Sequence, residues 1–402
     1  MTDPTWVPGA AGSGFGSDHL PFGRFRRTGE TRTRAGVRVG DRVLDLTGLP
    51  GPHSEAFATG DLTAFLAAGR ARWTAVREEL RDLLTDPART ADTLPHLLDL
   101  DEVTMLLPVD VGDYVDFYAS IDHATNVGRM FRPDGEPLTP NWRHLPISYH
   151  GRSGTVVPSG TPVTRPDGQY LDGGELAFGP SRRLDIEAEL GFVVGVPSEL
   201  GDPIPIAAFD EHVFGVVGLN DWSARDIQAW EYVPLGPHLG KSFATTISCW
   251  ITPLDALRSA RFPIAPQEPA PLDHLSGTPL TGLDIEIDVR IGGEIVSRPP
   301  YRTMYWSPEQ MLAHLTSNGA SVRTGDLFGS GTISGPLREQ RGSLLELSWN
   351  GAEPWEAGGR ARTFLEDGDE VVLEYRAPGE YGPLTLGTVS GTVVPRTRRR
   401  PR

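Results

Sequence analysis

The stretch Leu184-Asp-Ile-Glu-Ala-Glu-Leu-Gly-Phe-Val-Val-Gly-Val196 indicates what kind of fold this 402-residue chain adopts. Its first half alternates acidic with apolar residues and its second half is continuously apolar, which is typical of a strand that enters a core. A hairpin signal, Gly292-Gly293, lies between two more alternating segments. Further strand patterns are found at Leu283–Ser297, Leu344–Trp349, Glu370–Tyr375 and Thr388–Val394. We therefore expect a β-rich protein with few helices.

The chain is long enough for two domains, and its pattern changes near residue 108. Before that point, Gly36–Leu46 reads as two short strands around a turn, and Leu62–Leu84 has apolar residues at helical spacing. Later in the chain, Ser307 and Gln310 form a capping box that starts a helix, which ends before Gly319. The proline-rich segment Arg258–Gly282 is predicted to be a loop. We expect a small domain over residues 1–108 and a larger one over residues 109–402.

Composition excludes several kinds of partner. The formal charge is -16, which argues against nucleic acid, and the one basic run, Arg396–Arg402, reads as a solvated tail. No segment has the length and apolarity of a membrane span, and residues 1–15 do not resemble a secretion signal. A single cysteine, Cys249, cannot form an intrachain disulfide, which suits a reducing cytoplasm.

One count stands apart: of 37 basic residues only Lys241 is lysine. Surface positions accept either basic residue, whereas a site that needs a compact charge with rotatable donors requires lysine. A compositional bias toward arginine is the alternative explanation, and the count alone does not decide between the two. Gly240-Lys241-Ser242 is like the end of a phosphate loop, but the preceding glycine at the required spacing is missing, so we reject nucleotide binding.

Acidic residues at strand spacing form the first candidate site. Glu187 and Glu189 are two residues apart, so on a strand they face the same side and their carboxylates can converge on a hard cation. The same alternation occurs at Asp284, Glu286 and Asp288, where it looks like the solvated face of a strand. The pattern alone therefore leaves both interpretations open.

Three further features have residue types suited to catalysis. Asn220–Gln228 is a polar segment after an apolar run, and Arg225 and Gln228 would be neighbours on a helix. His123 has the side chain of a general base at neutral pH, although a lone histidine is more often structural. Glu346 lies in an apolar segment read as a strand, so it is either exposed on the far face or buried with a partner.

Together these segments resemble the fumarylacetoacetase family. The likeness rests on motifs spread over most of the chain and extends weakly to Gly36–Leu46. The motifs are Asp116-Phe-Tyr118, His123-Ala-Thr-Asn-Val-Gly128, Met130-Phe-Arg132, Pro140-Asn-Trp142, Tyr149-His-Gly-Arg152, Asn220–Gln228, Trp230–Pro237, Gly240-Lys-Ser-Phe243, Met304-Tyr-Trp306, Gly331–Pro336 and Leu345-Glu-Leu-Ser-Trp349. The resemblance implies a small SH3-like barrel domain followed by a large mixed β-sandwich roll, and a homodimer.

The resemblance also implies a site. A cation, Ca²⁺ or Mg²⁺, would be held by four carboxylates, which favour hard ions: Asp116, Glu187, Glu189 and Asp221. Lys241, Thr245 and the backbone near Trp222 would contribute to a second cation site. His123 would activate water, oriented by Glu346, while Arg225, Gln228 and Lys241 would stabilise the oxyanion. The residues implied to hold the substrate are Tyr118, Arg132, Tyr149, Tyr232 and Thr332.

The implied reaction is metal-dependent hydrolysis of the carbon–carbon bond of fumarylacetoacetate, a small diketo acid. Counting one divalent ion, the four carboxylates and the cations Arg132, Arg225 and Lys241 gives a net charge of +1, which would attract a dianionic substrate. Ala244 and the segment Tyr381–Gly387 depart from the family pattern, which puts the exact substrate in doubt. The alternatives are a related activity on an acylpyruvate or another keto acid, and a metal-binding scaffold without catalysis.

Overall fold

The computed structural model describes residues 2–278, 280–357 and 359–396. The expectation of a mainly β protein with an N-terminal and a C-terminal domain is confirmed. Of the predicted basic tail, only Arg396 lies within the described residues, where it pairs with Asp167 at 2.9 Å. Within the described residues, no helix has both the length and the apolar character needed to cross a membrane.

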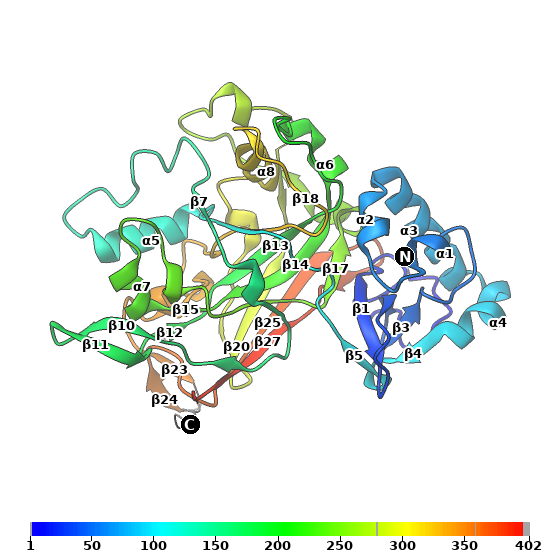
Figure 1. Ribbon diagram of the computed structural model, residues 1–402, viewed down its shortest axis with the longest axis horizontal. Helices are drawn as coiled ribbons and strands as arrows, with labels where there is room; N and C mark the ends of the chain where they lie inside the picture. The colour runs from blue at the N-terminus through cyan, green and yellow to red at the C-terminus, as the bar shows by residue number, and fades with distance from the viewer. Residues whose placement is uncertain (1, 279, 358, 397–402) are drawn as a thin grey trace.

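The N-terminal domain combines a small antiparallel sheet with short helices, as the sequence predicted (blue and cyan in Figure 1). The strands follow one another in the order β4-β3-β2-β1-β5. They are β1 (Phe22–Arg27), β2 (Arg34–Val39), β3 (Arg42–Asp45), β4 (Leu97–Asp99) and β5 (Val103–Met105). The helices are α1 (Ser54–Phe57), α2 (Thr63–Ala67), α3 (Arg70–Thr85) and α4 (Thr90–Thr93).

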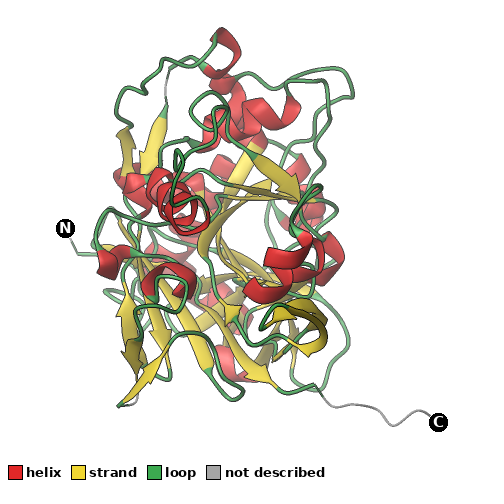
Figure 2. Ribbon diagram, turned by 90° about the vertical axis from the view of Figure 1, so that its left-hand side faces the viewer, coloured by secondary structure: helices red, strands yellow, loops and turns green. Residues whose placement is uncertain are grey.

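The C-terminal domain is built around two sheets, and Figure 2 shows their strands curling through the middle of the molecule with helices toward the outside. Its helices are α5 (Ile121–Phe131), α6 (Phe209–His212), α7 (Arg225–Glu231), α8 (Pro308–Thr316) and α9 (Leu344–Leu347). The strands of its larger sheet are β6 (Tyr114–Phe117), β7 (Ser148–His150), β8 (Val156–Pro158), β13 (Ala188–Val194), β14 (Val213–Asp221), β16 (Thr245–Ile247), β17 (Trp250–Pro253) and β22 (Leu327–Gly329).

The second sheet of this domain has the order β21-β20-β25-β27-β9, with β26 paired to β25. Its strands are β9 (Val163–Thr164), β20 (Glu286–Ile291), β21 (Glu294–Ser297), β25 (Glu370–Pro378), β26 (Pro383–Thr385) and β27 (Val389–Val394). The remaining strands of the described residues form four two-stranded ladders: β10 (Asp167–Asp172) with β11 (Glu175–Pro180), β12 (Leu184–Asp185) with β15 (Ser223–Ala224), β18 (Arg261–Pro263) with β19 (Thr281–Leu283), and β23 (Trp355–Ala357) with β24 (Arg360–Arg362).

The two domains share one continuous sheet. Strand β1 pairs with β17, with Phe22 opposite Ile251 and Gly23 opposite Trp250, so the larger sheet runs from β4 through β1 and β17 to β7. The division at residue 108 stays a prediction, because hydrogen bonds cross from one domain to the other without interruption. The N-terminal domain is therefore fastened to the sheet that carries strand β14.

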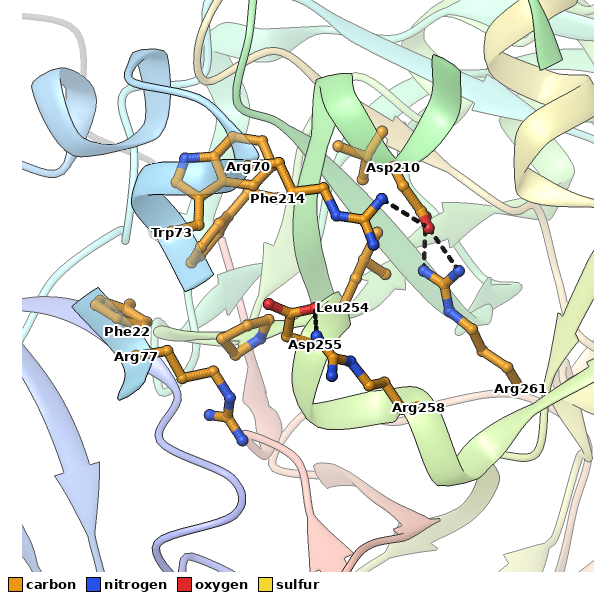
Figure 3. Close-up of a pocket in the computed structure, with 12 residues that line it drawn as sticks. Phe22, Arg70, Trp73, Arg77, Asp210, Phe214, Leu254, Asp255, Arg258 and Arg261 are labelled. Carbon is orange, nitrogen blue, oxygen red and sulfur yellow. Dashed lines mark hydrogen bonds and ion pairs between the residues drawn. The ribbon is translucent and has the colours of Figure 1, made fainter. Parts of the chain in front are cut away.

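The junction between the domains contains a cavity of about 240 Å³. Figure 3 shows the aromatic rings of Phe22, Trp73 and Phe214 on one side of it, with Arg77 beside Phe22, and shows Asp210, Arg258 and Arg261 on the other side. The ion pairs at this rim are Arg261–Asp210 at 2.7 Å, Arg70–Asp210 at 3.4 Å and Arg258–Asp255 at 2.7 Å. Because both lining carboxylates already have arginine partners, this cavity offers no free acid for a cation.

Local signals explain where the other predictions succeeded or failed. The hairpin at Gly292-Gly293 is confirmed as β20–β21, and the capping box confirms α8. The single helix predicted over Leu62–Leu84 is wrong: Gly69, with φ of 84°, separates α2 from α3. The proline-rich segment is mostly loop, but the short β18–β19 ladder closes it at both ends.

Candidate functional site

Four neighbouring strands bring acidic side chains to one place. In the order β6-β22-β13-β14, Asp116 lies opposite Gly329, and Glu189 lies opposite Leu219, two residues before Asp221. Glu187 precedes β13, because the strand predicted from Leu184 is divided into β12 and β13. The site is therefore assembled from strands that are distant in sequence but adjacent in the sheet.

The four predicted metal ligands lie together. Asp116, Glu187, Glu189 and Asp221 each offer a carboxylate oxygen, and these oxygens lie within 4.8 Å of one another. All four residues are buried, with at most 5% of their surface exposed. Burial of four like charges so close together is unfavourable unless cations compensate them.

A glycine leaves space among these oxygens. A Cβ atom on Gly329 would lie 2.9 Å from Glu189 Oε2 and 3.3 Å from Asp116 Oδ1. Two buried oxygens, Asp116 Oδ1 and Glu189 Oε1, have no hydrogen-bond partner among the described residues. An all-oxygen donor set in which one oxygen of Asp116 and one of Glu189 have no partner fits a hard divalent cation.

The electrostatics of the four carboxylates favour a bound cation. Burial, together with the charge of Asp221, raises the pKa of Asp116 well above its usual range, and burial together with Asp116 does the same for Glu189. Burial also opposes the charge on Glu187, but Lys241 and Arg225 outweigh it and hold the pKa of Glu187 far below its ordinary value. A divalent ion would stabilise the charged forms of Asp116 and Glu189.

Lys241 is placed between two members of this cluster. Its Nζ donates to Glu187 Oε2 and, at 2.8 Å, to Asp221 Oδ2. The side chain is 6% exposed, and although burial opposes its charge, Asp221 and Glu187 raise its pKa above the usual value. The only lysine of the chain is thus a buried amine in the site, whose charged form is stabilised by Asp221 and Glu187.

His123 and Glu346 form a buried pair beside the acids. His123 Nδ1 lies 2.7 Å from Glu346 Oε2, and the other glutamate oxygen accepts from Asn126 Nδ2 at 2.9 Å. Ser334 and Ser343 also donate to Oε2, each at 2.9 Å. Burial works against the charge of Glu346, but His123 and these hydrogen bonds lower its pKa below the ordinary value. The glutamate therefore stays charged and fixes the Nδ1–H tautomer of His123.

The strand predicted around Glu346 is wrong. Residues Leu344–Leu347 form the one-turn helix α9, whose N-cap Ser343 accepts a hydrogen bond from the backbone N–H of Glu346. All residues of this turn are buried, so an apolar pattern four residues long could not distinguish strand from helix. Of the two alternatives left open for Glu346, the structure shows burial with a partner.

Arg225 and Gln228 are neighbours on α7, as their spacing predicted. Arg225 donates to Gln228 Oε1 at 3.0 Å, to Asp185 Oδ2 at 2.7 Å, and pairs with Glu187 Oε1 at 2.7 Å. Asp185 in turn accepts from the backbone N–H groups of Leu344 and Leu345. Through Asp185, Arg225 thereby links helix α9 to the acid cluster. Helix α9 carries Glu346, the partner of His123.

Asp185 also changes the charge count, because it is fully buried and lies against Arg225. Including it, one divalent ion, the four cluster carboxylates and the three cations give a neutral site instead of the +1 expected from the sequence. Substrate attraction must therefore come from individual groups at the cavity mouth.

One cavity of about 310 Å³ connects these groups. It is lined by the acids Asp116 and Glu187, by His123, Arg225, Gln228 and Lys241, and by all five predicted substrate residues: Tyr118, Arg132, Tyr149, Tyr232 and Thr332. Arg132 and Tyr232 are exposed, whereas Thr332 is buried and its Oγ1 has no partner among the described residues. The Tyr149 hydroxyl donates to Asp221 Oδ2 at 3.1 Å, so it touches the acid cluster as well as the cavity.

The residues of the implied second cation site lie around Asp221. Thr245 Oγ1 donates to Asp221 Oδ1 at 2.7 Å, and Trp222 follows Asp221 with its indole bound to Thr246. Together with Lys241 and Tyr149, these contacts occupy both oxygens of Asp221. Here the structure shows contacts within the protein, and the second ion stays a prediction.

Sequence reasoning missed several residues that shape the site. Asn126, Ser334 and Ser343 hold Glu346, and Gly329 provides the space beside Asp116. Asn126 and Ser334 both lie within the motifs quoted above. However, Asn126 is 220 positions and Ser334 is 12 positions from Glu346, and no rule of sequence spacing connects residues so separated. Only the fold brings them together.

Buried carboxylates with unpartnered oxygens, a histidine–glutamate pair and a charged lysine on one cavity are typical of a metal-assisted hydrolase. Two family models match the chain: "Fumarylacetoacetase N-terminal" over residues 18–108 and "Fumarylacetoacetate (FAA) hydrolase C-terminal" over residues 114–394. The chain belongs to the fumarylacetoacetate hydrolase family.

Similar proteins support this membership along nearly the whole chain. Fumarylacetoacetase of Homo sapiens is 44% identical, covering 97% of this chain and 99% of that protein, and the enzyme of Oryza sativa subsp. japonica is 43% identical, covering 97% of each. Among solved structures, a fumarylacetoacetate hydrolase from Exiguobacterium antarcticum superposes with a TM-score of 0.57 at 18% identity, covering 94% of this chain and all of that one. A maleylpyruvate hydrolase from Sphingobium gives 0.53 at 16% identity over the same shares. These two show the fold.

Proposed function

We propose that this chain hydrolyses the carbon–carbon bond of the β-diketone fumarylacetoacetate, giving fumarate and acetoacetate. The observation that carries the proposal is the cavity on which the four-carboxylate cluster, Lys241 and the His123–Glu346 pair meet. Overall similarity to fumarylacetoacetases from animals and plants supports this substrate. The bound cation would be Ca²⁺ or Mg²⁺, the ions that an all-carboxylate site prefers.

A cation held by Asp116, Glu187, Glu189 and Asp221 would supply Lewis-acid stabilisation of the negative charge that develops on the diketone. His123 removes a proton from water through Nε2, because Glu346 occupies its Nδ1. The water oxygen bonds to the carbonyl carbon of the fumaroyl group, and the bond between that carbon and the methylene that separates the two ketones breaks. The electron pair of this bond goes to the methylene carbon, which takes the proton held by His123 and becomes the methyl group of acetoacetate. The new fumarate carboxyl keeps the other hydrogen of the water and releases it to solvent as a proton, so atoms and charges balance.

The cationic side chains have separate tasks in this scheme. Lys241 is held in place by Glu187 and Asp221 and directs a compact positive charge to the cavity wall, where an oxyanion develops. Arg225 uses three nitrogens on Asp185, Glu187 and Gln228, so its main contribution is to orient those groups. Gln228 keeps its amide N–H₂ for the substrate. Arg132, exposed at the cavity, is suited to a substrate carboxylate.

The test is an activity assay with controlled metal content. Purified protein treated with EDTA should lose its ability to consume fumarylacetoacetate, followed by absorbance, and Ca²⁺ or Mg²⁺ should restore it. Full activity of metal-free protein would refute metal dependence. A parallel panel of acylpyruvates tests the substrate, since faster turnover of any of them than of fumarylacetoacetate would contradict our assignment.

A homodimer is part of the proposal and is supported by exposed apolar side chains. Phe178 on the β10–β11 hairpin is 72% exposed, and Val233 and Leu235 after α7 are 65% and 96% exposed. The Trp230 indole reaches Gln169 at 3.3 Å, so the two segments adjoin. Contiguous exposed apolar groups mark interaction surfaces.

Light scattering coupled to gel filtration tests this surface. Phe178→Asp combined with Leu235→Asp should convert a dimer to a monomer, while Leu200→Asp, at an isolated residue that is 84% exposed, should not. A monomeric wild-type protein would refute the dimer. We also propose a cytoplasmic location, since the lone Cys249 is buried and forms no disulfide; fractionation of cells that express the chain would test it.

A further inference from the structure

Tyr114 is a buried residue next to the acid cluster for which the scheme above has no use. It is the first residue of β6, two positions before Asp116, and only 1% of its surface is exposed. A Cβ atom on Gly151 would lie 2.3 Å from the ring, so the absence of a side chain there lets the ring pack closely against the backbone. Its position is therefore tightly determined.

The hydroxyl of Tyr114 has no hydrogen-bond partner among the described residues. It lies 3.3 Å from the point where a Cβ of Gly329 would stand, and that same point is 3.3 Å from Asp116 Oδ1 and 2.9 Å from Glu189 Oε2. Three oxygens from three residues thus face the same point beside Gly329. A buried hydroxyl without a partner is destabilising, so its retention at this place requires an explanation.

We propose that Tyr114 is a positioning residue for the cation, whose hydroxyl donates a hydrogen bond to the carboxylate of Asp116 or Glu189 when the ion is bound. The inference rests on the proposed metal site. The hydroxyl has no partner among the described residues, and oxygens of Asp116 and Glu189 face the same point beside Gly329 as it does. A bound ion would fix these two carboxylates in place as hydrogen-bond acceptors. The hydrogen bond gained on binding then adds to metal affinity, as partners of metal-ligating side chains generally do.

The test compares two tyrosines that each lose only a hydroxyl. Tyr114→Phe keeps the packed ring, and Tyr301→Phe is the matched control, because the Tyr301 hydroxyl is also buried without a partner but lies away from the cluster and the cavity. Calorimetric titration of metal-free, full-length protein with Ca²⁺ and with Mg²⁺ gives Kd for each ion. We expect Tyr114→Phe to weaken binding by about 10- to 100-fold and Tyr301→Phe to leave it unchanged.

Thermal unfolding of the metal-free proteins separates positioning from packing. Tyr114→Phe should unfold at the same or a higher temperature than the wild type, because it removes an unpartnered polar group. Equal Kd values for wild type and Tyr114→Phe would overturn the inference, and so would a lowered unfolding temperature in metal-free Tyr114→Phe. A wild-type protein that binds neither ion would instead overturn the proposed metal site itself.

Discussion

Replacing Glu346 by glutamine tests the proposed base most directly. The carboxylate accepts hydrogen bonds from His123, Asn126, Ser334 and Ser343, and it is completely buried. Glutamine has nearly the same shape, so the substitution removes the negative charge with little change in side-chain volume. What disappears is the partner that stabilises His123 when it takes a proton from water.

The magnitude follows from the geometry. His123 Nδ1 and Glu346 Oε2 are 2.7 Å apart, which places the two charge centres about 4 Å from each other, and at an effective dielectric constant of about 20 such charges attract by about 4 kcal/mol. At about 1.4 kcal/mol per factor of ten, complete loss lowers the rate by about 10³-fold, within the range found for general bases. Because Glu346 does not line the cavity, KM should change little.

Initial rates of fumarylacetoacetate consumption measure both constants for Glu346→Gln. The control is Glu339→Gln, at an exposed residue of the neighbouring turn, which should behave as wild type. Circular dichroism and the Kd for Ca²⁺ establish that the fold and the acid cluster are retained. A kcat within threefold of wild type, with the fold intact, would refute the role of the pair.

Three other predictions follow from the same structure. Lys241→Arg should lower kcat by at least about 10²-fold, because a planar guanidinium does not fit where Nζ bridges Glu187 and Asp221; near-normal turnover would contradict this. Gly329→Ala should weaken Ca²⁺ binding at least about tenfold by placing a methyl group 2.9 Å from Glu189 Oε2, whereas Gly154→Ala, with nothing within 4 Å, should not alter the Kd. Burial lowers the pKa of His19 to about 3, so the folded protein favours the neutral imidazole. The contribution of this preference to the free energy of unfolding is complete above about pH 6.5 and declines as the pH falls toward 3, by about 2 kcal/mol at pH 5. Denaturant unfolding from pH 7 to 4 should show a smaller decline in His19→Gln, and an equal decline would disprove the assignment.

Much of the fold could be predicted because the deciding signals are local. The turn at Gly292-Gly293 and the capping box at Ser307 each lie within a few residues, and both gave the observed elements. The composition of the acid cluster was predicted by family resemblance, since the spacing of Glu187 and Glu189 alone left a solvated strand face as an alternative. That alternative was drawn from Asp284, Glu286 and Asp288. Glu286 is exposed and Asp284 is half-buried, but Asp288 is 4% exposed and paired with Arg298 and Arg376. A pattern in which charged and apolar residues alternate therefore does not show whether the charged side chains are exposed or buried.

The remaining features depend on contacts between distant segments. Nothing near Asp185 shows that it binds the backbone of Leu344 and Leu345, about 160 residues later. Likewise, the open space at Gly329 exists only because β22 lies between the strands of Asp116 and Glu189. The sequence contains these residues, but their roles arise from strand order, which propensity and periodicity do not determine.

The pairing of β1 with β17 has a consequence for how the molecule is made. His19 and Thr252, which flank this pairing, are 233 residues apart, so an N-terminal strand must wait for more than half of the chain to be synthesised before its partner exists. Contacts between residues so far apart in the sequence slow folding. Until they form, strand edges stay open to pairing with other molecules. Once formed, the first domain pairs with the edge of β17, so this edge is no longer open to pairing with another chain.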